Sequence, residues 1–171
     1  MKWVAAIPLV VLALLAILFA GYGLKRDPQV VPAALVGRPL PAGTLPKLDG
    51  SPGKLPLTAG IKGPVFLNVF FSTCAPCIQE APALMAMKQQ GVKIVGIAYK
   101  EPEGDTRAFL AEYGNPYAQV LVDRDGRQAI ELGASGAPET FLVDGKGMII
   151  AKHSGVMTPE KADELIQKAG L

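Results

Sequence analysis

The chain has 171 residues, of which 50% are hydrophobic and 19% are charged, and its formal net charge is +2. This length suits one domain with an appendage, and the near-neutral charge argues against nucleic-acid binding, which usually requires a concentrated basic face. Two Cys and one His are too few for a disulfide-stapled scaffold or for a four-ligand zinc site built without carboxylates.

The first apolar run covers residues 3–24 and contains no charged residue. As a helix, this run would span about 33 Å, enough to cross a hydrocarbon core of about 30 Å. We therefore interpret residues 1–24 as a transmembrane anchor. The alternative is a signal peptide cleaved near Ala20 or Gly21, although the apolar region of such a peptide usually has only about 7–15 residues. Basic residues flank the run on both sides, so the positive-inside rule leaves its orientation open.

Prolines dominate the next segment, since residues 27–64 contain eight of them. Their spacing excludes a helix of any useful length. We predict a linker over residues 25–43, followed by a domain over residues 44–171. That domain is expected to open with a short hairpin within residues 44–57.

After this segment, the sequence predicts alternating strands and helices. Apolar runs rich in β-branched and aromatic residues indicate strands, and Asp-Gly-Lys-Gly at residues 144–147 is a strong hairpin signal. The expected strands cover residues 65–71, 92–99, 120–122, 140–143 and 148–153, with a turn at 123–126. The expected helices cover residues 75–90, 105–113 and 158–169.

The order of these elements is β-α-β-α-β, then β-β-α. The first half is typical of parallel strands joined by crossover helices, and the second half adds an antiparallel hairpin. Thr158 is expected to be the N-cap of the last helix, with Pro159 at its first position. The sequence therefore predicts an α/β fold, in which a mixed central sheet carries helices on both faces.

The two cysteines, Cys74 and Cys77, lie where the first buried strand is followed by a helix. Unpaired amides and the helix dipole favour anions at a helix N-terminus, so we expect a lowered pKa for the Cys74 thiol and attack by its thiolate. Cys77 lies one turn further along on the same side and can resolve a mixed disulfide. Pro76 constrains the turn between them.

Other interpretations of the Cys pair are weaker. Haem attachment requires His directly after the second Cys, and Ile78 stands there. A metal chaperone would need more ligands, and the single His, His153, is distant in sequence. A structural disulfide remains an alternative, although closing so short a loop adds little stability. A C-x-x-C motif that follows a strand and opens a helix in a βαβ pattern is the thioredoxin signature.

The segment Cys-Ala-Pro-Cys at residues 74–77, with Pro82 five residues later, resembles the thioredoxin fold, whose members carry a helix proline at that offset. Residues 136–140 (GAPET) look like the segment that bears the cis-proline facing the Cys pair, here Pro138.

Further motifs resemble the DsbE/CcmG family. They are GNPY at residues 114–117, GASGAPETFLVD at residues 133–144, Val95-Gly96 and Tyr99-Lys100. The resemblance covers about residues 37–160 and includes the N-terminal anchor. Members of this family are membrane-anchored thiol:disulfide interchange proteins of cytochrome c maturation that face the periplasm.

The resemblance implies a monomer in the bacterial inner membrane, with a single membrane span and the soluble domain in the periplasm. A membrane thiol carrier would donate electrons, and apocytochrome c or a haem-ligation protein would accept them. No cofactor or metal is implied beyond the redox-active Cys74–Cys77 disulfide. A reductant in an oxidising compartment needs continuous recharging, which suits a protein held beside its donor. The alternatives are a general periplasmic reductase or oxidase with broad clients and a non-enzymatic binding module.

Two acidic residues enter the site by the same resemblance, Glu80 in the active site and Glu139 beside the groove. Thioredoxin has a buried Asp six residues before its first Cys, and this chain has Asn68 there, so the proton acceptor for Cys77 cannot be at that position. Glu80 shares a helix face with Cys77 and can take its proton. The alternatives are a solvated Glu80 that favours the helix dipole and a Glu139 at the groove rim.

The sequence departs from the family at two positions near the Cys pair. Thr73 stands where Trp usually precedes the first Cys, and Ser135 stands where an aromatic residue is common. We therefore expect a more open or more polar groove, with Thr73, Pro138 and Glu139 as candidate substrate-binding residues. Tyr99 and Tyr117 are expected to be core or rim residues.

Overall fold

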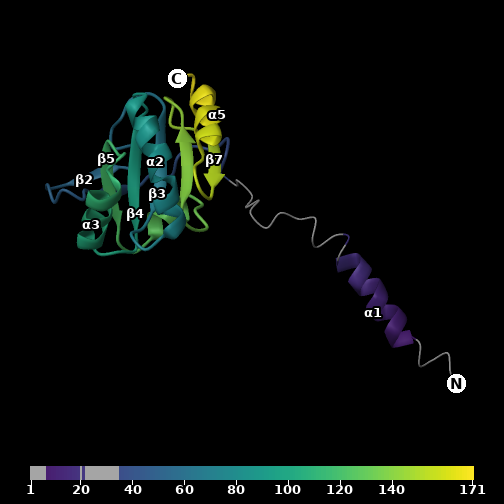
Figure 1. Ribbon diagram of the computed structural model, residues 1–171. Coiled ribbons are helices and arrows are strands. Elements are labelled where there is room, and N and C mark those ends of the chain that lie inside the picture. Colours follow the sequence, from purple (N-terminus) through teal and green to yellow (C-terminus); the bar gives the residue numbers. More distant parts are fainter. Residues whose placement is uncertain (1–6, 20, 22–34) are drawn as a thin grey trace. The chain divides into compact units, whose positions relative to one another are not determined.

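The computed structural model describes residues 7–19, 21 and 35–171, and the chain divides into two compact units, Met1–Val31 and Pro32–Leu171 (Figure 1). In the first unit, the apolar helix α1 (Ile7–Leu18) lies within the predicted anchor. The remainder of that prediction, and the linker up to residue 34, lie largely outside the described residues. Across the described ranges, none of the helices combines the length and the apolar character that a membrane crossing requires.

A five-stranded mixed sheet forms the centre of the second unit, with the strand order β5-β4-β3-β6-β7. Its strands are β3 (Val65–Phe70), β4 (Ile94–Tyr99), β5 (Gln119–Asp123), β6 (Glu139–Val143) and β7 (Ile149–Ser154). The strands β3, β4 and β5 are parallel, whereas β6 is antiparallel to both β3 and β7. The predicted mixed sheet is therefore confirmed.

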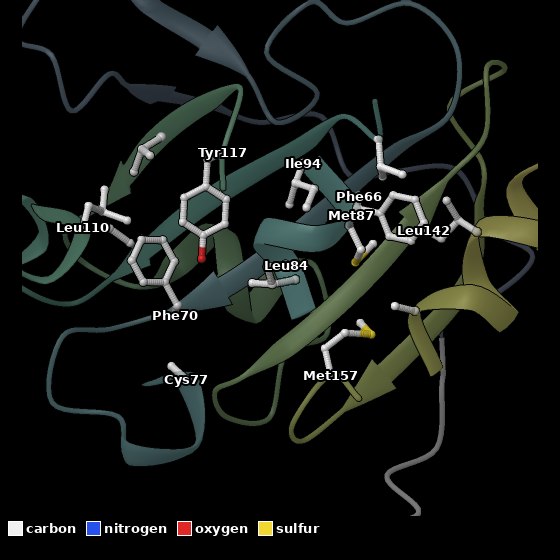
Figure 2. Packing of buried hydrophobic residues seen from close by; sticks show 14 of the residues in the cluster. Phe66, Phe70, Cys77, Leu84, Met87, Ile94, Leu110, Tyr117, Leu142 and Met157 are labelled. Carbon is white, nitrogen blue, oxygen red and sulfur yellow. The ribbon is translucent and has the colours of Figure 1, made fainter. Parts of the chain in front are cut away.

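Three helices cover one face of this sheet. They are α2 (Ala75–Gln89), α3 (Glu103–Tyr113) and α5 (Pro159–Ala169). Because side chains alternate along a strand, Phe66 and Phe70 of β3 point toward these helices, where they pack in one cluster with Leu84 of α2 (Figure 2). Asn68 lies between these two phenylalanines in the sequence, so it shares their face of the sheet.

The opposite face is covered by shorter elements, the hairpin of β1 (Thr44–Pro46) and β2 (Lys54–Pro56) and the helix α4 (Arg127–Glu131). The predicted hairpin is confirmed by the antiparallel pairing of β1 with β2. The sequence pattern does not predict α4, whose five residues are too few to show a helical period. Near its start, the buried Asp123 carboxylate at the end of β5 accepts a hydrogen bond from Ala129 N at 2.8 Å.

The helix ends follow the local signals. The Thr158 side chain accepts a hydrogen bond from Lys161 N at 3.3 Å, and Pro159 opens α5, so the predicted cap is confirmed.

Part of the segment predicted as a linker is bound to the sheet. Gly37 N donates a hydrogen bond to Ile149 O, and Leu40 N donates one to Gly147 O, both at 2.8 Å. The part of that segment after residue 35 therefore runs along the start of β7.

Packing between α2 and the sheet generates a first prediction. Leu84 is 2% exposed, so Leu84→Ala should leave a cavity and lower the free energy of unfolding by about 2–5 kcal/mol. Gln79→Ala, on the exposed side of the same helix, is the matched control and should change it by less than about 0.5 kcal/mol. Denaturant titration of both variants is the measurement, and equal effects would contradict the assigned packing.

Candidate active site

The Cys pair lies where β3 ends and α2 begins. Cys74 is the N-cap residue, with extended backbone angles (φ −83°, ψ 99°), and its Sγ accepts a hydrogen bond from Cys77 N at 3.2 Å. The two side chains form a disulfide, and each cysteine is only 3% exposed. The expected position of Cys74 at the helix N-terminus, with Cys77 one turn inside, is confirmed.

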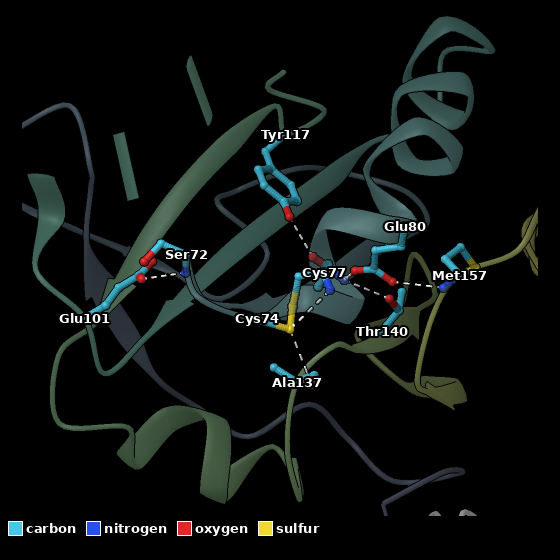
Figure 3. The surroundings of a disulfide bond; sticks show 10 residues. Ser72, Cys74, Cys77, Glu80, Glu101, Tyr117, Ala137, Thr140 and Met157 are labelled. Atoms are coloured by element: carbon cyan, nitrogen blue, oxygen red, sulfur yellow. Dashed lines mark hydrogen bonds between the residues drawn. A yellow bond between two sulfur atoms is a disulfide. The ribbon is translucent and has the colours of Figure 1, made fainter. Parts of the chain in front are cut away.

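The loop before β6 lies against this disulfide. The Ala137–Pro138 peptide bond is cis, as the resemblance implied, and the Ala137 carbonyl oxygen lies 3.6 Å from Cys74 Sγ (Figure 3). Pro138 is buried, and its carbonyl accepts a hydrogen bond from Gly155 N at 2.9 Å. The loop is thus held both at the Cys pair and at the segment after β7.

Glu80 is buried behind the Cys pair, with only 1% of its surface exposed. Its Oε1 accepts a hydrogen bond from Asn68 Nδ2 at 2.8 Å. Its Oε2 accepts one from Met157 N at 3.0 Å (Figure 3). Burial raises the pKa of Glu80 from 4.5 to about 7, although the two hydrogen bonds oppose this rise. The alternative of a solvated Glu80 is therefore wrong, and the carboxyl can exchange a proton near neutral pH.

A second layer of polar groups surrounds Asn68. Asn68 Nδ2 also donates to Thr140 Oγ1 at 3.1 Å, while Asn68 Oδ1 accepts from the Tyr117 hydroxyl at 2.7 Å. All three residues are buried, so of the two positions expected for Tyr117, core or rim, the structure shows the core. Sequence reasoning used Asn68 only to exclude a proton acceptor, whereas the structure makes it a hydrogen-bond donor to Glu80.

Glu139 forms a buried ion pair instead of lying at an exposed rim. Its Oε2 lies 3.0 Å from Lys152 Nζ, and the two side chains are 3% and 5% exposed. Its other hydrogen-bond donors are the backbone N and Oγ of Ser135 and the Oγ of Ser154. Lys152 Nζ also donates to Gly133 O at 2.8 Å. The pair therefore connects the cis-proline loop to β7. Ser135, which stands where the family often has an aromatic residue, takes part by donating hydrogen bonds to Glu139.

Thr73, which directly precedes Cys74 in the sequence, is exposed. It lines a cleft of about 310 Å³. The cleft is lined by Phe71, Ser72, Thr73, Tyr99, Lys100, Glu101 and Asp105. The Glu101 carboxylate accepts a hydrogen bond from Ser72 N at 2.6 Å (Figure 3). It accepts another from Thr106 Oγ1, also at 2.6 Å. The Glu101 carboxylate thus positions the segment just before Cys74.

Sequence reasoning missed Met157, Lys152 and Glu101. Met157 acts through its backbone N–H, which no sequence pattern records, and the other two contact partners that are distant in the sequence.

In the described part of the chain, no three His, Cys, Asp or Glu side chains cluster in a way that could hold a metal ion.

A disulfide at the head of a helix, a cis-proline beside it and a mixed sheet beneath define the class: a thioredoxin-like thiol:disulfide oxidoreductase. The Redoxin family matches residues 35–166. A crystal structure of a protein assigned as the thiol:disulfide interchange protein DsbE from Chlorobium tepidum superposes with a TM-score of 0.67 at 27% identity, covering 78% of this chain and 96% of that one.

Curated relatives narrow the assignment. The thiol:disulfide interchange protein DsbE of Pseudomonas fluorescens biotype C is 38% identical over 157 residues, which are 91% of this chain and 86% of the relative. DsbE of Escherichia coli K12 is 41% identical over 145 residues, which are 82% of this chain and 77% of the relative. The chain belongs to the DsbE/CcmG family, as its motifs predicted.

The buried carboxyl of Glu80 predicts a pH-dependent stability. Because the pKa of Glu80 is about 7 in the folded protein against an ordinary 4.5, the folded state retains a proton that the unfolded chain releases between these pH values. The free energy of unfolding therefore falls as pH rises through this window. Relative to Glu80→Gln, which lacks this titration, the wild-type protein should lose about 3 kcal/mol between pH 4.5 and 7.5. Denaturant titrations across this range test it, and a difference that does not change with pH would contradict it.

The buried Glu139–Lys152 pair predicts a large effect of removing its cation. Lys152→Met leaves the Glu139 carboxylate buried without a counter-charge, so the free energy of unfolding should fall by about 3–5 kcal/mol. The matched control is Lys161→Met, which breaks the exposed Lys161–Glu164 pair and should cost less than about 1 kcal/mol. Thermal and denaturant unfolding of both variants decide the point, and similar small losses would show that the buried pair adds little.

Proposed function

We propose that this protein reduces the disulfide of apocytochrome c during cytochrome c maturation, directly or through a haem-ligation protein. The observation that carries the proposal is the buried Glu80 beside a redox-active Cys pair, with a pKa near 7 that suits proton transfer from a thiol. The DsbE relatives at 38% and 41% identity support thiol:disulfide interchange, and the resemblance of the motifs to the DsbE/CcmG family is the reason for choosing cytochrome c maturation as its setting.

The proposed reaction begins with the reduced protein. The Cys74 thiolate attacks one sulfur of the client disulfide, which forms a mixed disulfide and releases the first client thiol. The Cys77 thiol then transfers its proton to Glu80, and the resulting thiolate attacks Cys74 Sγ. The second client thiol leaves, and the two electrons have passed from the protein to the client. The product is the Cys74–Cys77 disulfide of the present structure.

A membrane thiol carrier is the proposed electron donor that reduces this disulfide again. In the same proposal, residues 1–24 anchor the protein in the bacterial inner membrane, and the predicted linker connects this anchor to a monomeric domain in the periplasm. The last part of that linker, from residue 35, joins the domain through its hydrogen bonds to β7. The uncharged apolar run of residues 3–24 is the feature that supports the anchor. Holding the domain beside its electron donor keeps the Cys pair reduced in an oxidising compartment.

The client is proposed to bind over Thr73 and the cis-proline loop. Thr73 lines the open cleft before Cys74, and the loop brings the Ala137 carbonyl oxygen to 3.6 Å from Cys74 Sγ, with Pro138 next in the chain. Glu139 contributes by holding the loop through Lys152. These contacts would place the client disulfide in line with Cys74.

The test is to trap the client on a Cys77→Ser variant of the full-length chain, expressed in its native host. Without the resolving thiol, the mixed disulfide at Cys74 should persist, and mass spectrometry should identify apocytochrome c or a haem-ligation protein together with a membrane thiol carrier. The double variant Cys74→Ser/Cys77→Ser is the control and should trap nothing. Capture of many unrelated secreted proteins would replace the proposal with a general reductase or oxidase, and an empty trap would contradict the client reaction.

A further inference from the structure

Tyr117 reaches the active site by crossing a neighbouring strand. Asn115 Oδ1 accepts a hydrogen bond from Tyr117 N at 3.0 Å, which shapes the turn before β5. The Tyr117 ring stacks on Phe70 with a centroid distance of 4.8 Å. It passes over Gly96 of β4, where a Cβ atom would lie only 2.8 Å from the ring. Gly96 pairs with Asn68 of β3, so the missing side chain allows the tyrosine hydroxyl to reach Asn68.

The hydroxyl determines which way the Asn68 amide faces. Burial raises the pKa of Tyr117 well above 10, so the phenol stays protonated and donates its hydrogen to Asn68 Oδ1 at 2.7 Å. An asparagine amide has an acceptor on one side and two donors on the other. With Oδ1 bound to Tyr117, both N–H groups of Nδ2 point away from it, one toward Glu80 Oε1 and one toward Thr140 Oγ1. The reverse orientation would place two oxygen atoms against each other.

We propose that Tyr117 is a positioning residue for thiol–disulfide exchange, because its hydroxyl holds the Asn68 amide with its donors toward Glu80. The oriented donor keeps Glu80 ready to accept the proton of Cys77 in the resolving step. This inference rests on the proposed role of Glu80. It assigns a function in the reaction to the GNPY motif, which lies outside the Cys pair and the cis-proline loop.

The orientation of the Asn68 amide affects the pKa of Glu80 because of the groups that surround its carboxyl. The titratable groups that face it are Cys77, one turn earlier on α2, and Tyr117. The other elements provide neutral groups, namely Asn68 from β3, Thr140 from β6 and the Met157 N–H from the segment before α5. Among the described residues, no cation lies within ion-pair distance of Glu80. Neutral donors alone stabilise its carboxylate, so a misdirected Asn68 amide should raise its pKa.

The test uses Tyr117→Phe in the reduced full-length protein and the small disulfide 5,5′-dithiobis(2-nitrobenzoic acid). Attack by Cys74 releases the first coloured thiolate, and attack by Cys77 on the mixed disulfide releases the second, so the two steps are recorded separately. In the wild-type protein, the rate of the second step should rise with pH around 7, and Glu80→Gln should remove this rise. In Tyr117→Phe, the midpoint should move upward by about one pH unit, which makes the second step about tenfold slower below it. The first step should be unchanged.

Two further variants separate positioning from packing. Tyr113→Phe removes the hydroxyl of a half-exposed tyrosine that packs on Phe109, and it should leave the midpoint unchanged. Asn68→Ala should shift the midpoint at least as far as Tyr117→Phe, and adding Tyr117→Phe to it should cause no further shift, because both act through one amide.

An unshifted midpoint in Tyr117→Phe, equal changes in both steps, or additive shifts in the double variant would each overturn the inference. Because the probe is a small molecule, these results do not depend on which client the protein serves. A wild-type second step that matches Glu80→Gln would instead refute the role of Glu80, and with it this inference. Failure of client trapping would leave the positioning result unaffected.

Discussion

The carboxylate of Glu80 is almost completely removed from water, and the protein must supply the hydrogen bonds that water would have made. One donor comes from Asn68 on the central strand β3, and the other is the backbone N–H of Met157, just before the last helix. The sheet, the active-site helix and the segment that leads into α5 must therefore all be in place before this charge is tolerated. This requirement links the fold of the whole domain to the chemistry of the Cys pair.

The two buried acids of the site have opposite electrostatic environments. Glu139 has a cation, Lys152, at 3.0 Å, and a paired carboxylate of this kind is suited to holding a loop in place. Glu80 has only neutral donors, so burial dominates and its pKa rises to about 7. A group that titrates near neutral pH is suited to proton transfer. The same residue type thus holds a loop in place at one position and, at the other, has the raised pKa that the proposed proton transfer requires.

Much of the fold could be predicted because its signals are local. The buried strand before Cys74, the Pro at the start of α2 and the Thr158 cap each depend on neighbouring residues in the chain, and all appear where the sequence indicated. The helix α4 could not be predicted in this way. It is a single short turn whose first amides bind the carboxylate of Asp123 at the end of β5, and no periodic pattern records that contact.

The sequence by itself determined the mixed α/β architecture and the Cys74–Cys77 pair, because strand runs, helix caps and motif spacing are local to the chain. The cis-proline at Pro138 was implied by the resemblance to the thioredoxin fold. The charge states around that pair were decided only by the tertiary structure. Glu80 looked as compatible with solvent as with burial until α2 packed on the sheet beside Asn68. The partner of Glu139, Lys152, comes from the next strand. The physical reason is that desolvation and hydrogen bonding depend on which surfaces meet in space, and sequence spacing specifies those meetings only within one element.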